Sequence, residues 1–75
     1  MPRIPTVSAR KLIKVLKKSG FIHDHTQGSH YIFYHSQKKI IISVPVHKGR
    51  DLGRGITRAI LQDTKISAKD FLKLL

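Results

Sequence analysis

The middle of this chain contains three runs of β-branched and aromatic residues that are separated only by short polar links. The runs cover residues 21–26, 30–35 and 39–44. The links are Gln27-Gly28-Ser29 and Ser36-Gln37-Lys38, and their composition is typical of turns. Links this short join antiparallel neighbours, because a parallel pair needs a crossover of about a dozen residues or more. The sequence therefore predicts a three-stranded antiparallel meander.

The third run also indicates which side chains face inward. Alternate residues of a strand point to opposite faces. One face carries Ile40, Ile42 and Val44, and the other carries Ile41 and Ser43. Pro45 follows, and proline has no N–H to give to a sheet. We therefore expect the strand to end near Pro45 or to lie at a sheet edge.

A segment with helical periodicity precedes the meander. Residues 1–7 carry two prolines and should form an extended lead-in, after which Ser8 is a suitable N-cap. Apolar residues then recur at helical spacing, at Ala9, Leu12, Ile13 and Leu16. Gly20 tolerates a left-handed turn and marks the end of the segment. These features predict an amphipathic helix.

Two further helical segments follow the meander. Residues 47–54 read as a loop rich in glycine and charge. From Gly55 onward, helical spacing returns at Ile56, Ala59 and Ile60, with Leu61 beside them. Ser67-Ala68-Lys69-Asp70 resembles a capping box ahead of a last helix with an apolar face of Phe71, Leu74 and Leu75. The order α-β-β-β-α-α predicts an α+β fold in which helices pack on one face of the antiparallel sheet.

Size and charge narrow the function. The chain has 75 residues, so we expect a single domain over residues 1–75. It carries 15 Lys and Arg against 4 acidic residues, a formal net charge of +11. Such a charge attracts phosphate backbones, anionic lipid or an acidic protein, and nucleic acid is the first expectation.

Three features of the sequence exclude other classes. There is no cysteine, which excludes disulfides and thiolate zinc sites. No apolar run approaches the roughly 18–20 residues of a membrane span. The first residues lack the apolar stretch of a secretory signal. We therefore expect a cytoplasmic protein that does not enter a membrane.

Several short stretches, taken in chain order, resemble a known family. They are Ser8-Ala9-Arg10-Lys11-Leu12-Ile13, Gly20-Phe21, Gly28-Ser29-His30, Val44-Pro45-Val46-His47, Leu52, Gly55, Ile60-Leu61, Ile66-Ser67, Phe71 and Leu75. In this order they resemble the HicA family, small toxins of bacterial and archaeal toxin–antitoxin pairs. One departure is that the family typically has Thr and then an aliphatic residue after Gly55, whereas here Ile56 precedes Thr57. We expect this exchange to alter packing or phosphate contacts at that helix start, not the chemistry.

The resemblance implies both a fold and an activity. The fold is that of a double-stranded-RNA-binding domain, in agreement with the predicted element order. The activity is that of a ribonuclease that cleaves mRNA and inhibits translation, with the histidine of Gly28-Ser29-His30 as the catalytic residue. The usual partner is a HicB antitoxin that covers this histidine. Because the chain is strongly basic, we expect the antitoxin to be acidic.

His30 has side-chain chemistry that suits such an activity. Cleaving RNA without a metal or other cofactor needs a group that takes a proton from the attacking 2′-OH, and histidine titrates near neutral pH. We expect His30 to be this general base, giving 2′,3′-cyclic phosphate and 5′-OH ends. From the residues alone, the simpler interpretation is a hairpin turn with His30 as an exposed edge residue. The alternative function is therefore a non-catalytic RNA-binding module that uses the same basic face.

Basic residues on three segments are candidates for binding RNA. In a double-stranded-RNA-binding-like arrangement, the first helix, the first inter-strand turn and the later helix start can face RNA. The predicted RNA-binding residues are Gly28, Ser29, Lys11, Lys14, Lys18, Arg54 and Arg58. Each lysine taken singly is equally consistent with a solvated surface.

The remaining histidines receive structural interpretations. His23 and His25 are two apart, so on a regular strand both point to one face. No Cys or Glu is available to complete a ligand set, so we predict no metal site. We interpret His35 as an ordinary strand-end residue and His47 as a structural residue that bonds into the following loop. Tyr31 is a weak candidate for stacking on a base.

Overall fold

The structure is a computed structural model, and it describes residues 4–75. Its elements in chain order are β1 (Val7–Ser8), α1 (Ala9–Lys18), β2 (Ile22–Gln27), β3 (His30–His35), β4 (Ile40–Pro45), β5 (Asp51–Leu52), α2 (Arg54–Thr64) and α3 (Ala68–Leu74). The predicted α+β order α-β-β-β-α-α is confirmed, and β1 and β5 are additions to it. The first three residues of the predicted lead-in lie outside the described residues.

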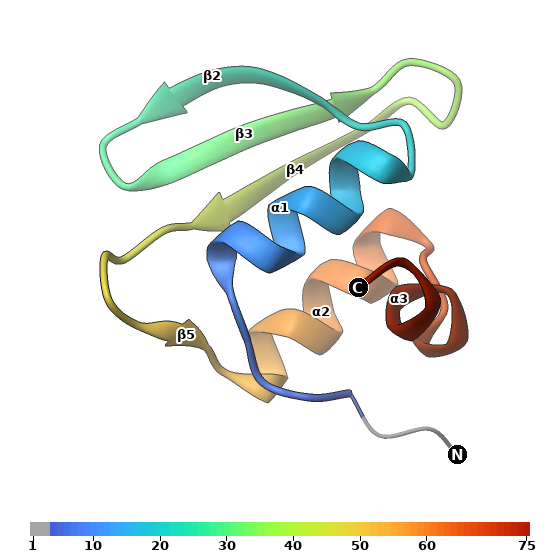
Figure 1. Ribbon diagram of the computed structural model, residues 1–75. Helices are drawn as coiled ribbons and strands as arrows, with labels where there is room; N and C mark the ends of the chain where they lie inside the picture. The colour runs from blue at the N-terminus through green and yellow to red at the C-terminus, as the bar shows by residue number, and fades with distance from the viewer. Residues whose placement is uncertain (1–3) are drawn as a thin grey trace.

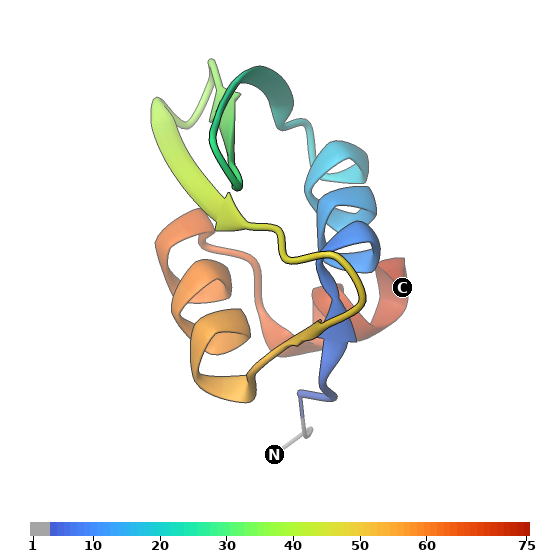
Figure 2. The same cartoon turned by 90° about the vertical axis from the view of Figure 1, so that its left-hand side faces the viewer.

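Strands β2, β3 and β4 form the predicted antiparallel meander, with β3 in the centre. Helices α1 and α2 lie on the same side of this sheet (Figures 1 and 2). Phe33 of β3 and Ile42 and Val44 of β4 are buried against the helices. The opposite face is open and carries the exposed Ile41 and Ser43, as predicted. Strand β4 starts one residue later than predicted, because Lys39 has a φ of +55° and belongs to the turn.

Pro45 takes a position where a missing N–H costs no bond within the sheet. It pairs with His30 at the end of β3 and β4. The next pair along is hydrogen-bonded, because Val46 N–H donates to Ser29 O over 2.7 Å. Pairs alternate between hydrogen-bonded and non-hydrogen-bonded in an antiparallel ladder, so the backbone nitrogen of Pro45 points away from β3. Strand β4 is an edge strand, as expected from this proline.

Helix α1 begins and ends as the sequence predicts. Ser8 is the N-cap, and its Oγ accepts a hydrogen bond from Lys11 N–H over 3.2 Å. Gly20 follows the C-cap with a φ of +99°. The buried face of α1 consists of Ala9, Leu12, Val15 and Leu16. Ser67 likewise caps α3, its Oγ accepting from Asp70 N–H over 3.1 Å.

Helix α2 presents a different face from the predicted one. Ile60 and Leu61 are buried as expected, but Ile56 and Ala59 are exposed and Thr57 and Thr64 are buried. The hydroxyls of these threonines donate hydrogen bonds to backbone carbonyls one turn earlier. Thr57 Oγ1 donates to Gly53 O over 3.0 Å, and Thr64 Oγ1 donates to Ile60 O over 2.7 Å. A hydroxyl that bonds its own helix can be buried at low cost, which the apolar pattern does not reveal.

The segment predicted as a loop over 47–54 is partly ordered. Within it, β5 pairs antiparallel with β1, Val7 opposite Leu52 and Ser8 opposite Asp51. Val7 and Leu52 are buried in the core. This pairing ties the chain after the sheet to the entrance of α1. It delivers the chain directly into α2, which begins at Arg54.

Candidate functional site

His30 lies at one end of the sheet, immediately after the turn that joins β2 to β3. Gly28 has a φ of +57°, and a Cβ added there would meet no other atom within 4 Å. The turn is therefore open to solvent as well as tight. Ser29 O is held by Val46 N–H, which connects the turn to the segment that leaves β4. The exposed His30 is thus carried on a fixed backbone.

The His30 side chain points to the open face of the sheet and meets Ser43 there. His30 Nδ1 and Ser43 Oγ are 3.3 Å apart. When the proton of the neutral imidazole is on Nδ1, the Nδ1–H group donates a hydrogen bond to Ser43 Oγ. The lone pair on Nε2 is then free. This tautomer is the one that can take a proton from a substrate hydroxyl.

A pocket of about 200 Å³ opens beside Pro45, the cross-strand partner of His30. Its lining is Pro45, His47, Arg50, Asp51, Leu52, Gly53 and Ile56. Gly53 is the N-cap of α2 and provides no side-chain cap for the first amide groups of that helix. The exposed Arg54 is the first residue of α2. An uncapped N-terminus and an arginine both favour an anion near this pocket.

The predicted RNA-binding residues fall into two groups. Gly28, Ser29 and His30 are consecutive at the end of the sheet, and the loop that leaves β4 connects them to the α2 start with Arg54. In Figure 1 the β2–β3 turn is at the upper left and the start of α2 is at the bottom, with the loop and β5 between them. Of the predicted set, the structure thus brings together Gly28, Ser29 and His30, whereas Arg54 follows at the far end of the loop and β5.

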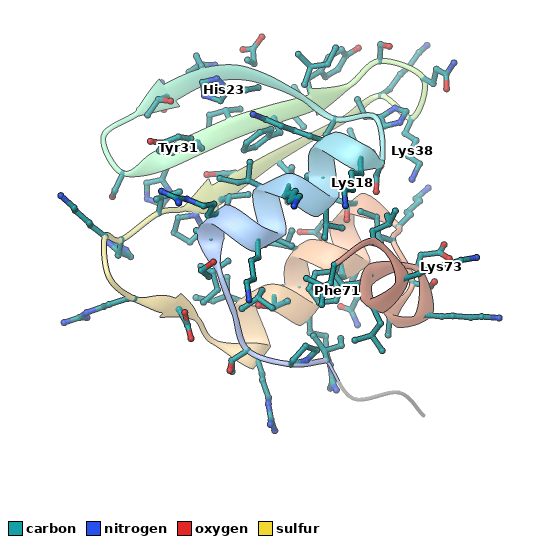
Figure 3. All side chains as sticks on the ribbon, in the orientation of Figure 1. Lys18, His23, Tyr31, Lys38, Phe71 and Lys73 are labelled. Carbon is teal, nitrogen blue, oxygen red and sulfur yellow. The ribbon has the colours of Figure 1, made fainter. Side chains whose placement is uncertain are left out.

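The other predicted residues lie elsewhere. Lys11 and Lys14 line a separate pocket with Pro5, Thr6, Val7 and Leu75. Lys18 is at the opposite end of α1, where its Nζ donates to Leu74 O over 3.1 Å (Figure 3). Arg58 lies in a groove formed with Ile4, Leu61, Gln62, Ile66, Ser67 and Ala68. None of these four side chains lines the pocket beside Pro45.

The expectation that His23 and His25 share a face is wrong. The register of β2 against β3 shifts between these two residues, which is the mark of a β-bulge. The His23 ring lies against Tyr31 and Phe33, on the side of the helices (Figure 3). The opposite, open face has a pocket that His25 lines with Asp24, Ile32, Tyr34 and Ile41. The extra residue of the bulge reverses the alternation on which the prediction depended.

His35 is a strand-end residue, as interpreted, but it is also buried. Its ring meets Phe21 edge to face, with centroids 5.0 Å apart. Its Nδ1 accepts a hydrogen bond from Lys38 N–H over 3.1 Å, which fixes the β3–β4 turn. A Cβ on Gly20 would stand 2.8 Å from its Nε2. His35 therefore serves the core and not the site at His30.

Ser43 and Arg50 were not among the catalytic or RNA-binding residues predicted from the sequence. The alternation of β4 had placed Ser43 on the open face, but only the register with β3 sets it beside His30. That register follows from the turn over residues 36–39, which joins β3 to β4. Pairing residues backward from this turn was the available signal in the sequence. The position of Arg50, directly before β5, depends on the pairing of β5 with β1. No sequence pattern predicts that pairing.

Within residues 4–75, no three His or Asp side chains gather closely enough to hold a metal ion. In the same part of the chain, no helix has the length and apolar character to cross a membrane. Residues 9–66 match a family model described as HicA toxin of bacterial toxin-antitoxin. No curated protein matches the chain. The matched segment covers well over half of the chain and contains His30, Ser43 and the α2 start.

Proposed function

The chain belongs to the HicA toxin family of bacterial toxin–antitoxin systems, and from this premise we propose that it is a metal-independent endoribonuclease. Residues 1–75 act as one toxin domain that cleaves mRNA in the cytoplasm and so inhibits translation. His30 is the general base, and the reaction uses no cofactor.

The observation that carries this proposal is the environment of His30. The side chain is exposed at the end of the sheet, beside a turn with free space at Gly28. Its Nδ1 is within hydrogen-bonding distance of Ser43 Oγ. A sugar–phosphate backbone can approach Gly28 closely because no side chain stands there. The imidazole is thus both accessible and oriented.

The chemistry follows from these positions. His30 Nε2 takes the proton of a 2′-OH, and the freed oxygen attacks the adjacent phosphorus. The P–O2′ bond forms as the P–O5′ bond breaks, and the leaving 5′ oxygen takes up a proton. The products are a 2′,3′-cyclic phosphate and a 5′-OH end. Negative charge grows on the non-bridging phosphate oxygens, and donors placed in advance stabilise it. We assign this task to Arg54 and the uncapped amides at the start of α2, which the loop after β4 connects to the sheet.

The remaining basic residues hold RNA farther from the cut. Gly28, Ser29 and Arg54 bind the nucleotides next to the cleaved bond. Lys11, Lys14, Lys18 and Arg58 bind flanking phosphates, because they lie in other pockets or at the far end of α1. The net charge of +11 supports a contribution from many phosphate contacts.

The test is cleavage of a long RNA by the purified protein in excess EDTA. The parent protein should cut, and a folded His30→Ala variant should be slower by a factor of about 10²–10⁴, which is the usual contribution of general acid–base catalysis. His25→Ala is the matched control, since it removes another exposed histidine of the same sheet. End-group analysis should find 2′,3′-cyclic phosphate, and 5′-phosphate ends would contradict the mechanism.

Binding without cutting would support the alternative function. If neither the parent nor His30→Ala cleaves RNA but both bind it with a steep salt dependence, the chain is an RNA-binding module. Circular dichroism of each variant separates a loss of activity from a loss of fold.

The partner we propose is an acidic HicB-like antitoxin that covers His30. Attraction between opposite charges raises the rate of encounter, and salt screens it. We expect association with the antitoxin to slow by at least tenfold between low and high salt, as measured by stopped-flow fluorescence. An association rate that does not change with salt would contradict the electrostatic part of this proposal.

A further inference from the structure

The hydrogen-bonded ladder between β3 and β4 continues for one residue beyond β4. Val46 N–H donates to Ser29 O over 2.7 Å, which extends the ladder past the last paired residues. The Val46 side chain packs against the core, on the same side as Val44 of β4. Since side chains alternate along an extended chain, His47 points to the other side, with Pro45. His47 is exposed, in agreement with this direction.

This direction places His47 on the face that carries His30. Directly paired residues point to the same face, and His30 pairs with Pro45. Ser43 and His47 are two residues before and two residues after Pro45. They are therefore the two diagonal neighbours of His30. The 3.3 Å approach of Ser43 Oγ to His30 Nδ1 shows that a side chain can reach His30 along one of these diagonals.

Two imidazoles on diagonal neighbours can serve the attacking and the leaving oxygen of one phosphodiester. Diagonal neighbours in an antiparallel pair are roughly 7–8 Å apart, a span that long side chains close from both sides. In-line displacement puts the attacking 2′ oxygen and the leaving 5′ oxygen on opposite sides of phosphorus. One imidazole cannot stand on both sides at once, so a second proton carrier is needed for the leaving group.

The surroundings of His47 agree with this task. It lines the pocket beside Pro45 together with Arg50 and the Gly53 cap of α2. Arg50 N–H donates to His47 O over 3.1 Å, so a single turn holds both side chains at the pocket. Among the hydrogen bonds of residues 4–75, none uses the His47 imidazole. Its backbone bonds into the loop, as the sequence interpretation expected. That interpretation gave the His47 side chain no part in catalysis.

We propose that His47 is the general acid of the cleavage that His30 begins, an inference that rests on the proposed ribonuclease function. His47 enters the reaction as the imidazolium. It gives its proton to O5′ as the P–O5′ bond breaks, and it is left neutral. His30 holds the proton taken from the 2′-OH. Proton exchange with water restores both groups.

The test compares two leaving groups. One substrate is an RNA oligonucleotide with a cleavage site mapped on natural RNA, and the other carries a bridging sulfur in place of O5′ at that site. A thiolate leaves without a proton, so the second substrate needs no general acid. His47→Ala should cut the natural oligonucleotide at least 100-fold more slowly than the parent. It should cut the sulfur-bridged one within about threefold of the parent, because the acid is no longer required.

His30→Ala and His47→Gln are the controls. His30→Ala should be slow on both substrates, because attack by the 2′-OH still needs the base. His47→Gln keeps a polar side chain that cannot donate as an acid, and it should show the same rescue by sulfur as His47→Ala. This second variant keeps the test decisive if the alanine disturbs the loop.

The outcomes separate the two proposals. If His47→Ala or a folded His47→Gln is slowed equally on both substrates, His47 positions or binds RNA and is not the acid. If both variants cut natural RNA at the parental rate, His47 has no part in the reaction, while His30 keeps its own. If the parent and His30→Ala are alike on both substrates, the ribonuclease function fails, and the role of His47 fails with it.

Discussion

At Gly20, the sequence predicts the backbone conformation but not the tertiary contact. Its place after an amphipathic helix predicts the left-handed conformation, and its φ is +99°. The sequence does not show that His35 closes over it from the end of β3. The Nε2 atom of His35 stands 2.8 Å from where a Cβ on Gly20 would be. That contact depends on the path of three strands, so no local pattern reports it.

Gly20→Ala should therefore destabilise the protein by more than backbone strain alone. A left-handed residue costs about 1–2 kcal/mol when it carries a side chain, and displacing His35 adds to this cost. Gly49→Ala is the matched control, because Gly49 has a φ of +78° with no atom within 4 Å of the added Cβ. Urea unfolding should give a clearly larger loss for Gly20→Ala. Equal losses of stability in the two variants would show that the His35 side chain moves aside at no measurable cost.

Ser43 is the residue through which the orientation of His30 can be examined. Ser43→Ala removes the acceptor for His30 Nδ1–H and frees the ring to rotate. We expect kcat to fall by about tenfold with little change in KM, less than the roughly 100-fold that a 1 Å misplacement of a reacting group costs. Ser43→Thr keeps the hydroxyl and should recover most of the rate. A rise in KM at constant kcat would assign Ser43 to RNA binding instead.

At the scale of elements, the three strands of the meander and the three helices could be predicted, but β1, β5 and the inward face of β2 and α2 could not. The β-branched and aromatic runs are strong signals for β2, β3 and β4. The faces of β2 are reversed by one bulged residue between His23 and His25. The face of α2 is turned by threonines whose hydroxyls bond within the helix. Strand β5, with two residues, is too short for a periodic signal.

The face of α2 can be checked by two neighbouring substitutions. Thr57 is fully buried and Ile56 is 46% exposed, whereas apolar spacing would reverse these roles. Thr57→Ala should cost about 1–3 kcal/mol of unfolding free energy, from a lost hydrogen bond and a small cavity. Ile56→Ala should stay near 0.5 kcal/mol, as surface changes usually do. Thermal or urea unfolding measures the stability of both variants. A larger loss of stability for Ile56→Ala would support the inward face predicted from apolar spacing.

At the scale of the whole molecule, one part of the positive charge stands at the start of α2 and another at the C-terminal ends of the helices. The N-terminal end of α2, which begins with Arg54, is at the bottom of Figure 1. Ser19, Lys65 and Leu74, at the C-terminal ends of the three helices, line one pocket with Lys38 and Lys73. There Lys18 and Lys38 donate to Leu74 O and Thr64 O, over 3.1 and 3.3 Å. Lysines are favourable at helix C-termini, so part of the net charge serves the fold.

This division predicts a dependence on RNA length. In a His30→Ala background, Arg54→Gln should weaken binding of RNA a few nucleotides long and of RNA of 15 to 20 nucleotides alike. Lys18→Gln should weaken only the longer RNA, because Lys18 lies at the far end of α1 (Figure 3). Each lost phosphate contact should lower the salt slope by about 0.7 for single strands. Fluorescence anisotropy measures both, and an equal effect of Lys18→Gln on short RNA would contradict this placement.

The bulge in β2 also affects the tendency of the free toxin to aggregate. Strand β2 is at the edge of the sheet, where a straight strand would offer a row of unpaired amides and carbonyls to another molecule. The exposed Ile22 and Tyr34 lie beside that edge and would add apolar adhesion. The extra residue between His23 and His25 twists the edge and breaks its spacing. A chain released from its antitoxin is thereby protected against stacking edge to edge into aggregates.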